Sequence, residues 1–306
     1  MLFDKALRAT VMTTELLVNS NVSKKILYKS LNIAKEFEYK YSAYKNDSLL
    51  SKINNASGIE AIKCTKDEAL IFQKALEIAT LSDGKFDPTI GALTQGLYGF
   101  GTNSSKIPKA RELDKIKKLV NYKLLDINKN EIYLKQKGMK LDLGGIGKGY
   151  VADIIIKHLL DSGASRALVS VGGEICCFGK KYNIAIKNPF SNDNIAIIKS
   201  SKNPISISTS GDYERYIGSK EHHHILDSKS AKQNHYYSSV TLIKNTIDAT
   251  MLDGVATIIF NSPEDELKIL ADKFNIAIIA ITPQKKIIFE NFSTIDIECF
   301  EIYPFK

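Results

Sequence analysis

A glycine-rich stretch near the middle of the chain constrains its local fold more than any other segment. It reads MKLDLGGIGKGYVADIIIKHLLDSG from Met139 to Gly163. Its four closely spaced glycines are Gly144, Gly145, Gly147 and Gly149. Glycines let the backbone turn sharply, and the apolar residues between Val151 and Leu159 recur at helical spacing. We therefore predict a strand end, a tight turn and an amphipathic helix that stops near Gly163.

A glycine turn that opens a helix is a candidate anion site. Its unpaired N–H groups and the positive end of the helix dipole attract negative charge, and Lys148 adds a full charge there. The segment GGIGKG nevertheless lacks both the GxxxxGK[ST] spacing of a P-loop and the GxGxxG spacing of a dinucleotide site. Two interpretations stay open: a phosphate or pyrophosphate cradle, or a tight turn that only needs small residues.

Composition indicates a globular protein with a sizeable core. The 306 residues are 44% hydrophobic and 25% charged, and the net charge of +8 comes mostly from lysines scattered along the whole length. Nucleic-acid binding would need a clustered basic stripe, so we expect no nucleic-acid partner. The four cysteines form no CxxC pair, so neither a zinc site nor a disulfide framework is predicted.

The N-terminal residues give an expectation about location. They contain no apolar core long enough for a secretion signal, and no later run approaches membrane-spanning length. As written, the sequence predicts a cytoplasmic protein without a transmembrane segment. If a leader was removed, the expectation changes to a periplasmic or cell-surface protein.

Helical and strand patterns are unevenly distributed along the chain. Helices are predicted over residues 24–41, 65–82, 106–121 and 265–274, and strands over 10–18, 122–134 (two), 167–178, 182–187, 195–198 and 205–208. Because helices gather in the first half and short antiparallel strands in the second, we predict an α+β fold. We expect one domain over 1–306, with possible sub-regions 1–140 and 141–306.

Asp253 and Thr257 form a candidate metal site. They stand four residues apart, so on a helix both side-chain oxygens lie on one face about one turn apart. A carboxylate and a hydroxyl are hard oxygen ligands suited to Mg²⁺. The same pair is common on solvated helix faces, but this helix is apolar, and a carboxylate in an apolar helix needs a partner.

Three consecutive histidines, 222 to 224, form a second candidate cluster. In an extended segment consecutive side chains point to opposite faces, so the three cannot share one metal. We expect His224, which precedes apolar Ile225 and Leu226, to be the one fixed by its surroundings, and a histidine near neutral pKa is a natural general base. An exposed turn with incidental imidazoles is the alternative.

Six segments of the chain read, in order, YSAYKNDSLLSKIN, FDPTIGALTQGLYGFG, DLGGIGKGYVAD, TSGDYERY, HHILD and LDGVAT. Together they resemble the ApbE family of FAD:protein FMN transferases, and they follow the order of that family. The third is similar to the family signature DLGGIAKGYAVD and the fourth to TSGDYRRY. The resemblance covers nearly the whole chain. It implies an ApbE-like fold of mixed, largely antiparallel sheets with helices, in two intimately packed sub-regions.

The resemblance implies a reaction. Such enzymes bind FAD as substrate and a divalent metal, usually Mg²⁺. They transfer the FMN moiety through a phosphoester bond to a threonine hydroxyl of an acceptor protein, and release AMP. The implied acceptor is a redox protein or a subunit of a membrane redox complex. An FAD pyrophosphatase that gives FMN and AMP, or an FAD-binding protein without turnover, are the alternatives.

The resemblance also implies site residues. His224 matches the essential histidine of the family, for which we infer a role as base toward the acceptor hydroxyl. Asp253, Thr257 and the backbone carbonyl of Gly145 are the implied metal ligands. The positions that match FAD contacts are Arg8, Tyr44, Lys85, Phe86, Asp87, Asp142, Lys148 and Leu226.

Three positions depart from the family pattern. Arg8-Ala9-Thr10 stands where Met-Gly-Thr is usual, so Arg8 replaces a methionine at an FAD contact. Ser228 replaces the proline of HIIDP, and Leu252 replaces the alanine before Asp253. The last two change a loop and a packing position without removing a ligand.

Overall fold

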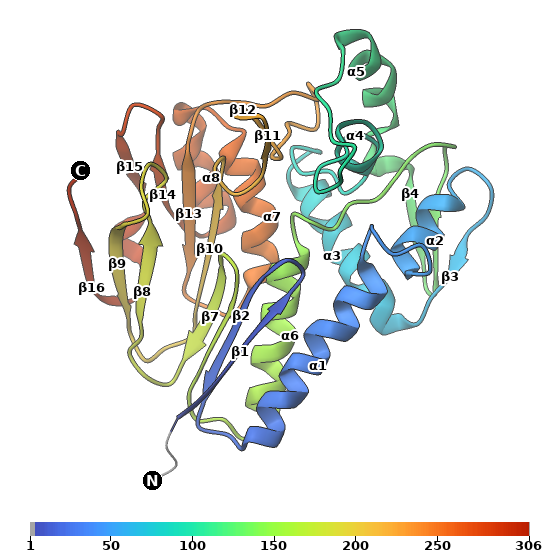
Figure 1. Ribbon diagram of the computed structural model, residues 1–306. Coiled ribbons are helices and arrows are strands. Elements are labelled where there is room, and N and C mark those ends of the chain that lie inside the picture. Colours follow the sequence, from blue (N-terminus) through green and yellow to red (C-terminus); the bar gives the residue numbers. More distant parts are fainter. Residues whose placement is uncertain (1–3, 306) are drawn as a thin grey trace. The chain divides into compact units, whose positions relative to one another are not determined.

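The computed structural model describes residues 4–305, shown in Figure 1. The chain forms two compact units, each built from separate segments. The first unit takes residues up to Glu36, Lys148–Gly211 and the residues from Tyr236 on, and the second takes Phe37–Gly147 and Asp212–His235. The sub-regions expected from the sequence, 1–140 and 141–306, each run without interruption, whereas these units do not.

An eight-stranded antiparallel sheet forms the frame of the first unit (Figure 1). Its strands are rich in isoleucine and valine, which suit the pleated surface of a sheet. In spatial order they are β1 (Lys5–Val11), β2 (Thr14–Ser20), β6 (Ala167–Val171), β7 (Glu174–Phe178), β10 (Ile205–Gly211), β13 (Ser239–Lys244), β14 (Ala277–Ile281) and β15 (Ile287–Glu290). Helices and antiparallel strands together confirm the predicted α+β fold.

The prediction of one strand over residues 10–18 is wrong. The chain reverses between β1 and β2, so that Val11 pairs with Thr14 and Arg8 with Leu17. The reversal uses Met12 and Thr13, both at positive φ (48° and 62°). Residues of these types rarely adopt that conformation, so the sequence carries no turn signal here.

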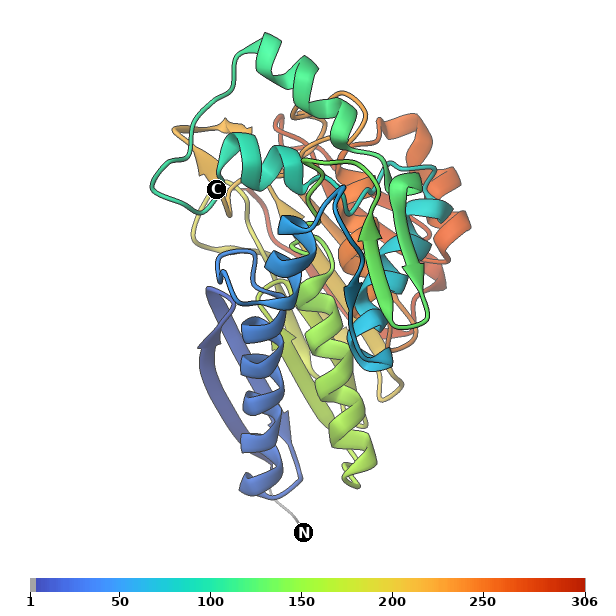
Figure 2. The ribbon, with the colours of Figure 1, turned by 90° about the vertical axis from the view of Figure 1, so that its right-hand side faces the viewer.

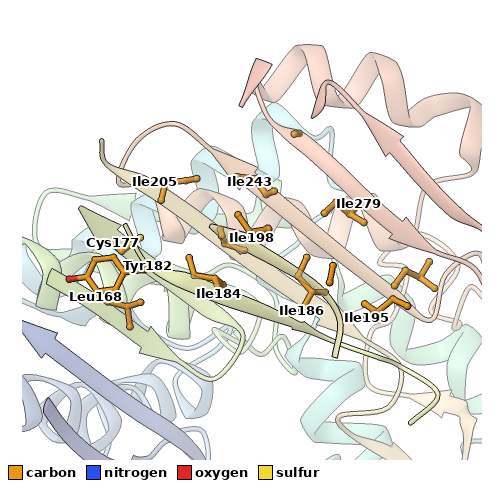
Figure 3. Packing of buried hydrophobic residues seen from close by; sticks show 14 residues of the cluster. Leu168, Cys177, Tyr182, Ile184, Ile186, Ile195, Ile198, Ile205, Ile243 and Ile279 are labelled. Carbon is orange, nitrogen blue, oxygen red and sulfur yellow. The ribbon is translucent and has the colours of Figure 1, made fainter. Parts of the chain in front are cut away.

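A second, three-stranded sheet covers one face of the large sheet in the first unit. Its strands, in spatial order, are β16 (Ile297–Ile302), β9 (Asn194–Ser200) and β8 (Asn183–Lys187). Figure 3 shows isoleucines of β8 and β9, such as Ile184 and Ile198, facing Ile205, Ile243 and Ile279 of the large sheet. Each buried isoleucine contributes about 2 kcal/mol of hydrophobic stabilisation, so this layer is a substantial part of the core.

Helices belong to the other layer of the first unit. α7 (Ala249–Phe260) packs against β10 and β13, and α8 (Leu267–Phe274) follows a short 3₁₀ turn. α6 (Gly147–Asp161) lies beside α1 (Lys24–Tyr41), as Figures 1 and 2 both show, and His158 Nε2 lies 3.4 Å from the carbonyl of Ile26. The helices predicted over 24–41, after the glycine stretch and over 265–274 are confirmed.

The second unit combines helices of different lengths with two small antiparallel sheets. Its helices are α2 (Leu49–Asn55), α3 (Lys66–Leu81), α4 (Gly91–Leu93), the π-helical turn Thr94–Tyr98, α5 (Ala110–Ile116) and the 3₁₀ turns Lys117–Leu119 and Tyr122–Leu124. Its strands are β3 (Ile62–Lys63), β4 (Leu125–Asn128), β5 (Glu131–Leu134), β11 (Tyr216–Ile217) and β12 (Ser219–His223). The capping box at the start of α3 is present: Thr65 accepts from the N–H of Glu68, and Glu68 accepts from that of Thr65.

The helix predicted over 106–121 is shorter than expected. It begins at Ala110 and gives way to a 3₁₀ turn after Ile116. Pro108 disfavours a helical conformation at Ile107, which explains the late start.

Within residues 4–305, no helix combines the length and the apolar composition that a membrane crossing requires.

Candidate functional site

In the first unit, the start of α6 holds the carboxylate of Asp253. Lys148 Nζ donates to Oδ1 of Asp253 at 3.0 Å and to Oδ2 at 3.2 Å, and the backbone N–H of Gly149 donates to Oδ2 at 3.0 Å. Asp253 is 2% exposed, so these contacts replace its hydration. Lys148 and the N–H group of Gly149, both in the stretch that the sequence marked as an anion site, thus contact a carboxylate of the chain itself.

Gly149 permits this contact because α6 and α7 approach closely. A Cβ atom at Gly149 would lie 2.2 Å from the carbonyl oxygen of Ala249, the first residue of α7. Real atoms do not approach so closely, so any side chain here would push the helices apart. The glycine is therefore needed for packing of the two helices.

Asp153 fixes the N-terminus of α7 from the facing helix. Its carboxylate accepts from the N–H groups of Ala249 and Thr250 at 2.8 Å each, and from the Thr250 hydroxyl at 2.6 Å. A carboxylate at a helix N-terminus satisfies unpaired N–H groups and complements the dipole. Asp253 lies one turn further along the same helix, so Asp153 also helps to set its position.

Glu174, which the sequence analysis missed, is a third charged group at this place. It starts β7, is fully buried, and its Oε1 lies 3.4 Å from Lys148 Nζ. Neither of its oxygens accepts a hydrogen bond of normal geometry from the described residues. The only sequence signal is one acidic residue in the apolar run ALVSVGGEICCF.

The pKa values of Glu174 and Lys148 are both raised, for different reasons. Burial raises the pKa of Glu174, and the charge of Asp253 raises it further, while Lys148 opposes the shift. Burial alone would lower the pKa of Lys148, but Asp253 and Glu174 outweigh that effect and raise it. Lys148 therefore stays charged, whereas Glu174, with its pKa raised to about 8, is largely protonated at neutral pH.

The donor set fits a hard divalent cation. The Asp253 carboxylate is buried next to the Lys148 ammonium, and Thr257 lies one helical turn beyond Asp253. The part of the chain that the structure describes holds no group of three or more His, Cys, Asp or Glu able to bind a metal. A cation at Asp253 would therefore take one carboxylate and otherwise neutral oxygens, as Mg²⁺ does when waters and phosphates complete its shell.

In the second unit, Asp142 organises the glycine turn that leads to α6. Its Oδ1 accepts from the N–H of Gly144 at 2.7 Å, and its Oδ2 accepts from the hydroxyl of Thr94. Its own N–H donates to the carbonyl of Pro88 at 2.8 Å. Gly145 follows in this turn. Asp142 is thus both an implied FAD contact and a structural anchor.

The implied FAD contacts Lys85, Phe86 and Asp87 form one turn around a buried carboxylate. Asp87 is 5% exposed and accepts from the N–H and hydroxyl of Thr89 (2.8 and 2.6 Å) and from the N–H of Tyr122 (2.8 Å). Burial raises the pKa of Asp87, and these hydrogen bonds partly offset the shift. The carboxylate therefore shapes the turn, and Phe86 is buried beneath it.

Ser228, one of the departures from the family pattern, bonds directly to this turn. Its hydroxyl donates to the carbonyl of Gly84 and lies 3.2 Å from that of Lys85. Leu226, two residues earlier, is buried in an apolar cluster with Leu93 and Phe100. Hydrogen bonds of Ser228 therefore connect the segment that contains Leu226 to the turn that contains Lys85.

His224 is oriented by the backbone of Arg215. The N–H of His224 and its Nδ1 each lie 3.0 Å from the carbonyl oxygen of Arg215. A carbonyl only accepts, so Nδ1 carries the proton and Nε2 is the basic nitrogen of the ring. Tyr44, 57% exposed, donates to the carbonyl of Phe100 at 2.8 Å. Burial raises the pKa of Tyr44, and the charge of Arg215 opposes that shift.

The two contacts with Arg215 hold His224 in place, but His223 is the more deeply buried of the two histidines. His223 is fully buried, whereas His224 is half-buried. The strand β12 ends at His223, which is the one buried residue of that strand. Burial lowers the pKa of His223 to about 4.

Arg8, the remaining implied FAD contact, lies on β1 in the first unit. Its guanidinium is 3.2 Å from Glu15 of the neighbouring strand, and both side chains are largely exposed. An exposed pair of this kind contributes little to stability.

Comparison with known proteins places the chain in a family. The model of the ApbE family matches residues 9–280. The chain belongs to the ApbE family. A FAD:protein FMN transferase of Buchnera aphidicola is 31% identical over 87% of this chain and 80% of its own length. One of Klebsiella pneumoniae is 29% identical over 84% of this chain and 82% of its own. These names confirm the expectation of a transferase.

Solved structures of ApbE proteins have the same fold as this chain. The ApbE protein of Thermotoga maritima has a TM-score of 0.87 and 27% identity, and the match covers 97% of this chain and 100% of that one. The flavin transferase ApbE of Vibrio cholerae, at 24% identity and a TM-score of 0.83, shares the fold. The ApbE-like fold implied by the six segments is thereby confirmed.

Proposed function

We propose that this chain is a Mg²⁺-dependent transferase that moves the FMN moiety of FAD to a threonine hydroxyl of an acceptor protein and releases AMP. The names of its relatives support flavin transfer from FAD to a protein. The proposed dependence on Mg²⁺ rests on the buried carboxylate of Asp253, with Thr257 one helical turn away, in a chain of this family.

The proposed step exchanges one phosphoester bond for another. The threonine oxygen attacks the phosphorus on the FMN side of the pyrophosphate, and the bond from that phosphorus to the AMP oxygen breaks. The hydroxyl proton passes to Nε2 of His224, the basic nitrogen left by the contact of Nδ1 with the Arg215 carbonyl. AMP leaves with the bonding electron pair.

Asp253, Thr257 and the carbonyl of Gly145 are the proposed metal ligands. A bound Mg²⁺ would offset the negative charge that develops on the pyrophosphate oxygens. Lys148, whose charge its carboxylate neighbours maintain, is proposed to contact FAD from the same side of α6. Its contacts with Asp253 explain how this site stays ordered before substrate arrives.

The remaining FAD contacts are proposed from the family pattern. Tyr44 offers an exposed ring that suits stacking on a nucleobase or flavin. The turn of Lys85, Phe86 and Asp87, together with Asp142 and Leu226, offers a rigid backbone, because Asp87 and Asp142 are bonded internally. Arg8 is the least supported of these contacts, since it replaces a methionine and pairs with Glu15.

Incubation with FAD, Mg²⁺ and a threonine-containing acceptor, with and without a chelator, tests this function. We expect AMP and covalently flavinylated acceptor in equal amounts, and neither product when the metal is chelated. AMP with free FMN would instead indicate a pyrophosphatase. Bound FAD without any AMP would indicate a binding protein.

A further inference from the structure

We propose that Glu174 is a positioning residue that retains Lys148 beside the site when a divalent cation takes over Asp253. The inference rests on the proposed metal role of Asp253. It concerns a buried acidic residue that lies outside the six segments and has no part in the proposed reaction.

Lys148 has two acidic neighbours, Asp253 and Glu174, and it lies closer to Asp253. Its ammonium is 3.0 Å from Asp253 and 3.4 Å from Glu174, whereas Asp253 has a second donor in the N–H of Gly149. A cation that binds Asp253 repels the ammonium, and Glu174 is the neighbouring group of opposite charge. A short movement of the flexible lysine side chain therefore replaces one ion pair with the other.

A purely structural role explains Glu174 poorly. A carboxylate that is fully buried and accepts no well-formed hydrogen bond destabilises a fold, and a neutral residue of the same size would serve the strand better. Ser208, opposite Glu174 in the pairing of β7 with β10, is buried as well, and its hydroxyl offsets the raised pKa of Glu174 only in part. An acidic side chain is retained here at a cost, and Lys148 is the cation that it faces.

The variant Glu174→Gln separates these roles because it keeps the shape and removes the charge. Without Glu174, the ammonium has only Asp253 as a carboxylate partner, so it competes with the entering cation. We expect Glu174→Gln to need roughly tenfold more Mg²⁺ for the same effect, the order expected for one buried unit charge. In the metal-free protein, its unfolding temperature should equal or exceed that of the wild type.

The measurement is the thermal unfolding midpoint during Mg²⁺ titration, with FAD present and no acceptor. Glu298→Gln is the matched control, because it removes an exposed carboxylate paired with Lys181 at 2.7 Å in the same unit. It should respond to Mg²⁺ as the wild type does. Glu174→Asp, which keeps the charge, should recover most of the response.

Two results would overturn the inference while leaving the proposed function intact. One is a wild-type Mg²⁺ response in Glu174→Gln. The other is a lower metal-free midpoint, or failure to fold, in that variant, since a structural role predicts this. A wild-type protein whose midpoint does not respond to Mg²⁺ would instead remove the proposed metal site, and the inference with it.

Discussion

At the scale of single residues, the structure gives the proposed metal ligands different surroundings. Asp253 is buried and bonded to Lys148 and Gly149, whereas Thr257 is half-buried on the next turn of α7. Both were candidates from the sequence, because a spacing of four residues in an apolar helix places two oxygens on one face and the resemblance to the family implies metal ligands there. Glu174 could not be found, because it shares no local pattern with Lys148 or Asp253.

Thr257 offers the first test at this scale. We expect Thr257→Val to lose at least roughly tenfold in kcat/KM for AMP release, because one neutral oxygen is deleted at nearly constant volume. Thr257→Ser is the matched control, since it keeps the hydroxyl, and should stay close to wild type. Equal losses in both variants would show that packing of the methyl group matters and the oxygen does not.

At the scale of elements, α6 and α7 meet at Gly149. We expect Gly149→Ala to lower the free energy of unfolding by about 3 kcal/mol, because the new methyl group overlaps the carbonyl of Ala249. Gly96→Ala is the control, since the nearest atom to its Cβ would lie 3.8 Å away. Urea unfolding measures both variants. A wild-type stability in Gly149→Ala would mean that the two helices can separate without cost.

A second test at this scale concerns the loop that holds Ser228. Ser228→Ala removes the hydroxyl that donates to Gly84 and leaves that carbonyl without this bond. We expect FAD to bind several-fold more weakly, since a net hydrogen bond contributes about 1 kcal/mol to the order of the turn. Ser230→Ala in the same loop is exposed and should not change the FAD dissociation constant. Fluorescence titration distinguishes the two.

The sequence predicted elements better than it predicted their ends and turns. The capping box of α3 and the glycine turn before α6 are local signals, and both are present. The β1–β2 turn at Met12 and Thr13 is not encoded by local propensity. The pairing of β1 with β2, and of β2 with β6, holds these two residues in the turn conformation.

At the scale of the whole molecule, the order of motifs predicted the family, but hydrophobic periodicity did not predict the two units. Each unit joins segments far apart in the chain. β2 pairs with β6 across about 150 residues of sequence, and residues 212–235 belong with the segment that ends at Gly147. Local sequence patterns do not predict such long-range pairings, because these depend on tertiary packing.

Stability of the molecule should fall at mildly acidic pH because of His223. Its pKa in the folded protein is about 4, lowered by burial and by the nearby His235 and His222. An unfolded histidine has a pKa near 6.5, so between these values the unfolded state binds more protons and stability falls as the pH is lowered. Urea unfolding midpoints should therefore decrease from pH 7 to pH 5. His223→Gln should flatten this dependence, and an unchanged slope would contradict the assignment.

We propose that Asp253 holds a Mg²⁺ ion against the pyrophosphate of FAD. Titration of FAD into the wild type and Asp253→Ala, each with and without Mg²⁺, tests it most directly. Because one carboxylate and neutral oxygens form a sparse shell, phosphate oxygens must complete it, and the two ligands must strengthen each other. Mg²⁺ should tighten FAD binding at least about fivefold in the wild type and have little effect in Asp253→Ala. An equal Mg²⁺ effect in both proteins would place the metal elsewhere and contradict the account.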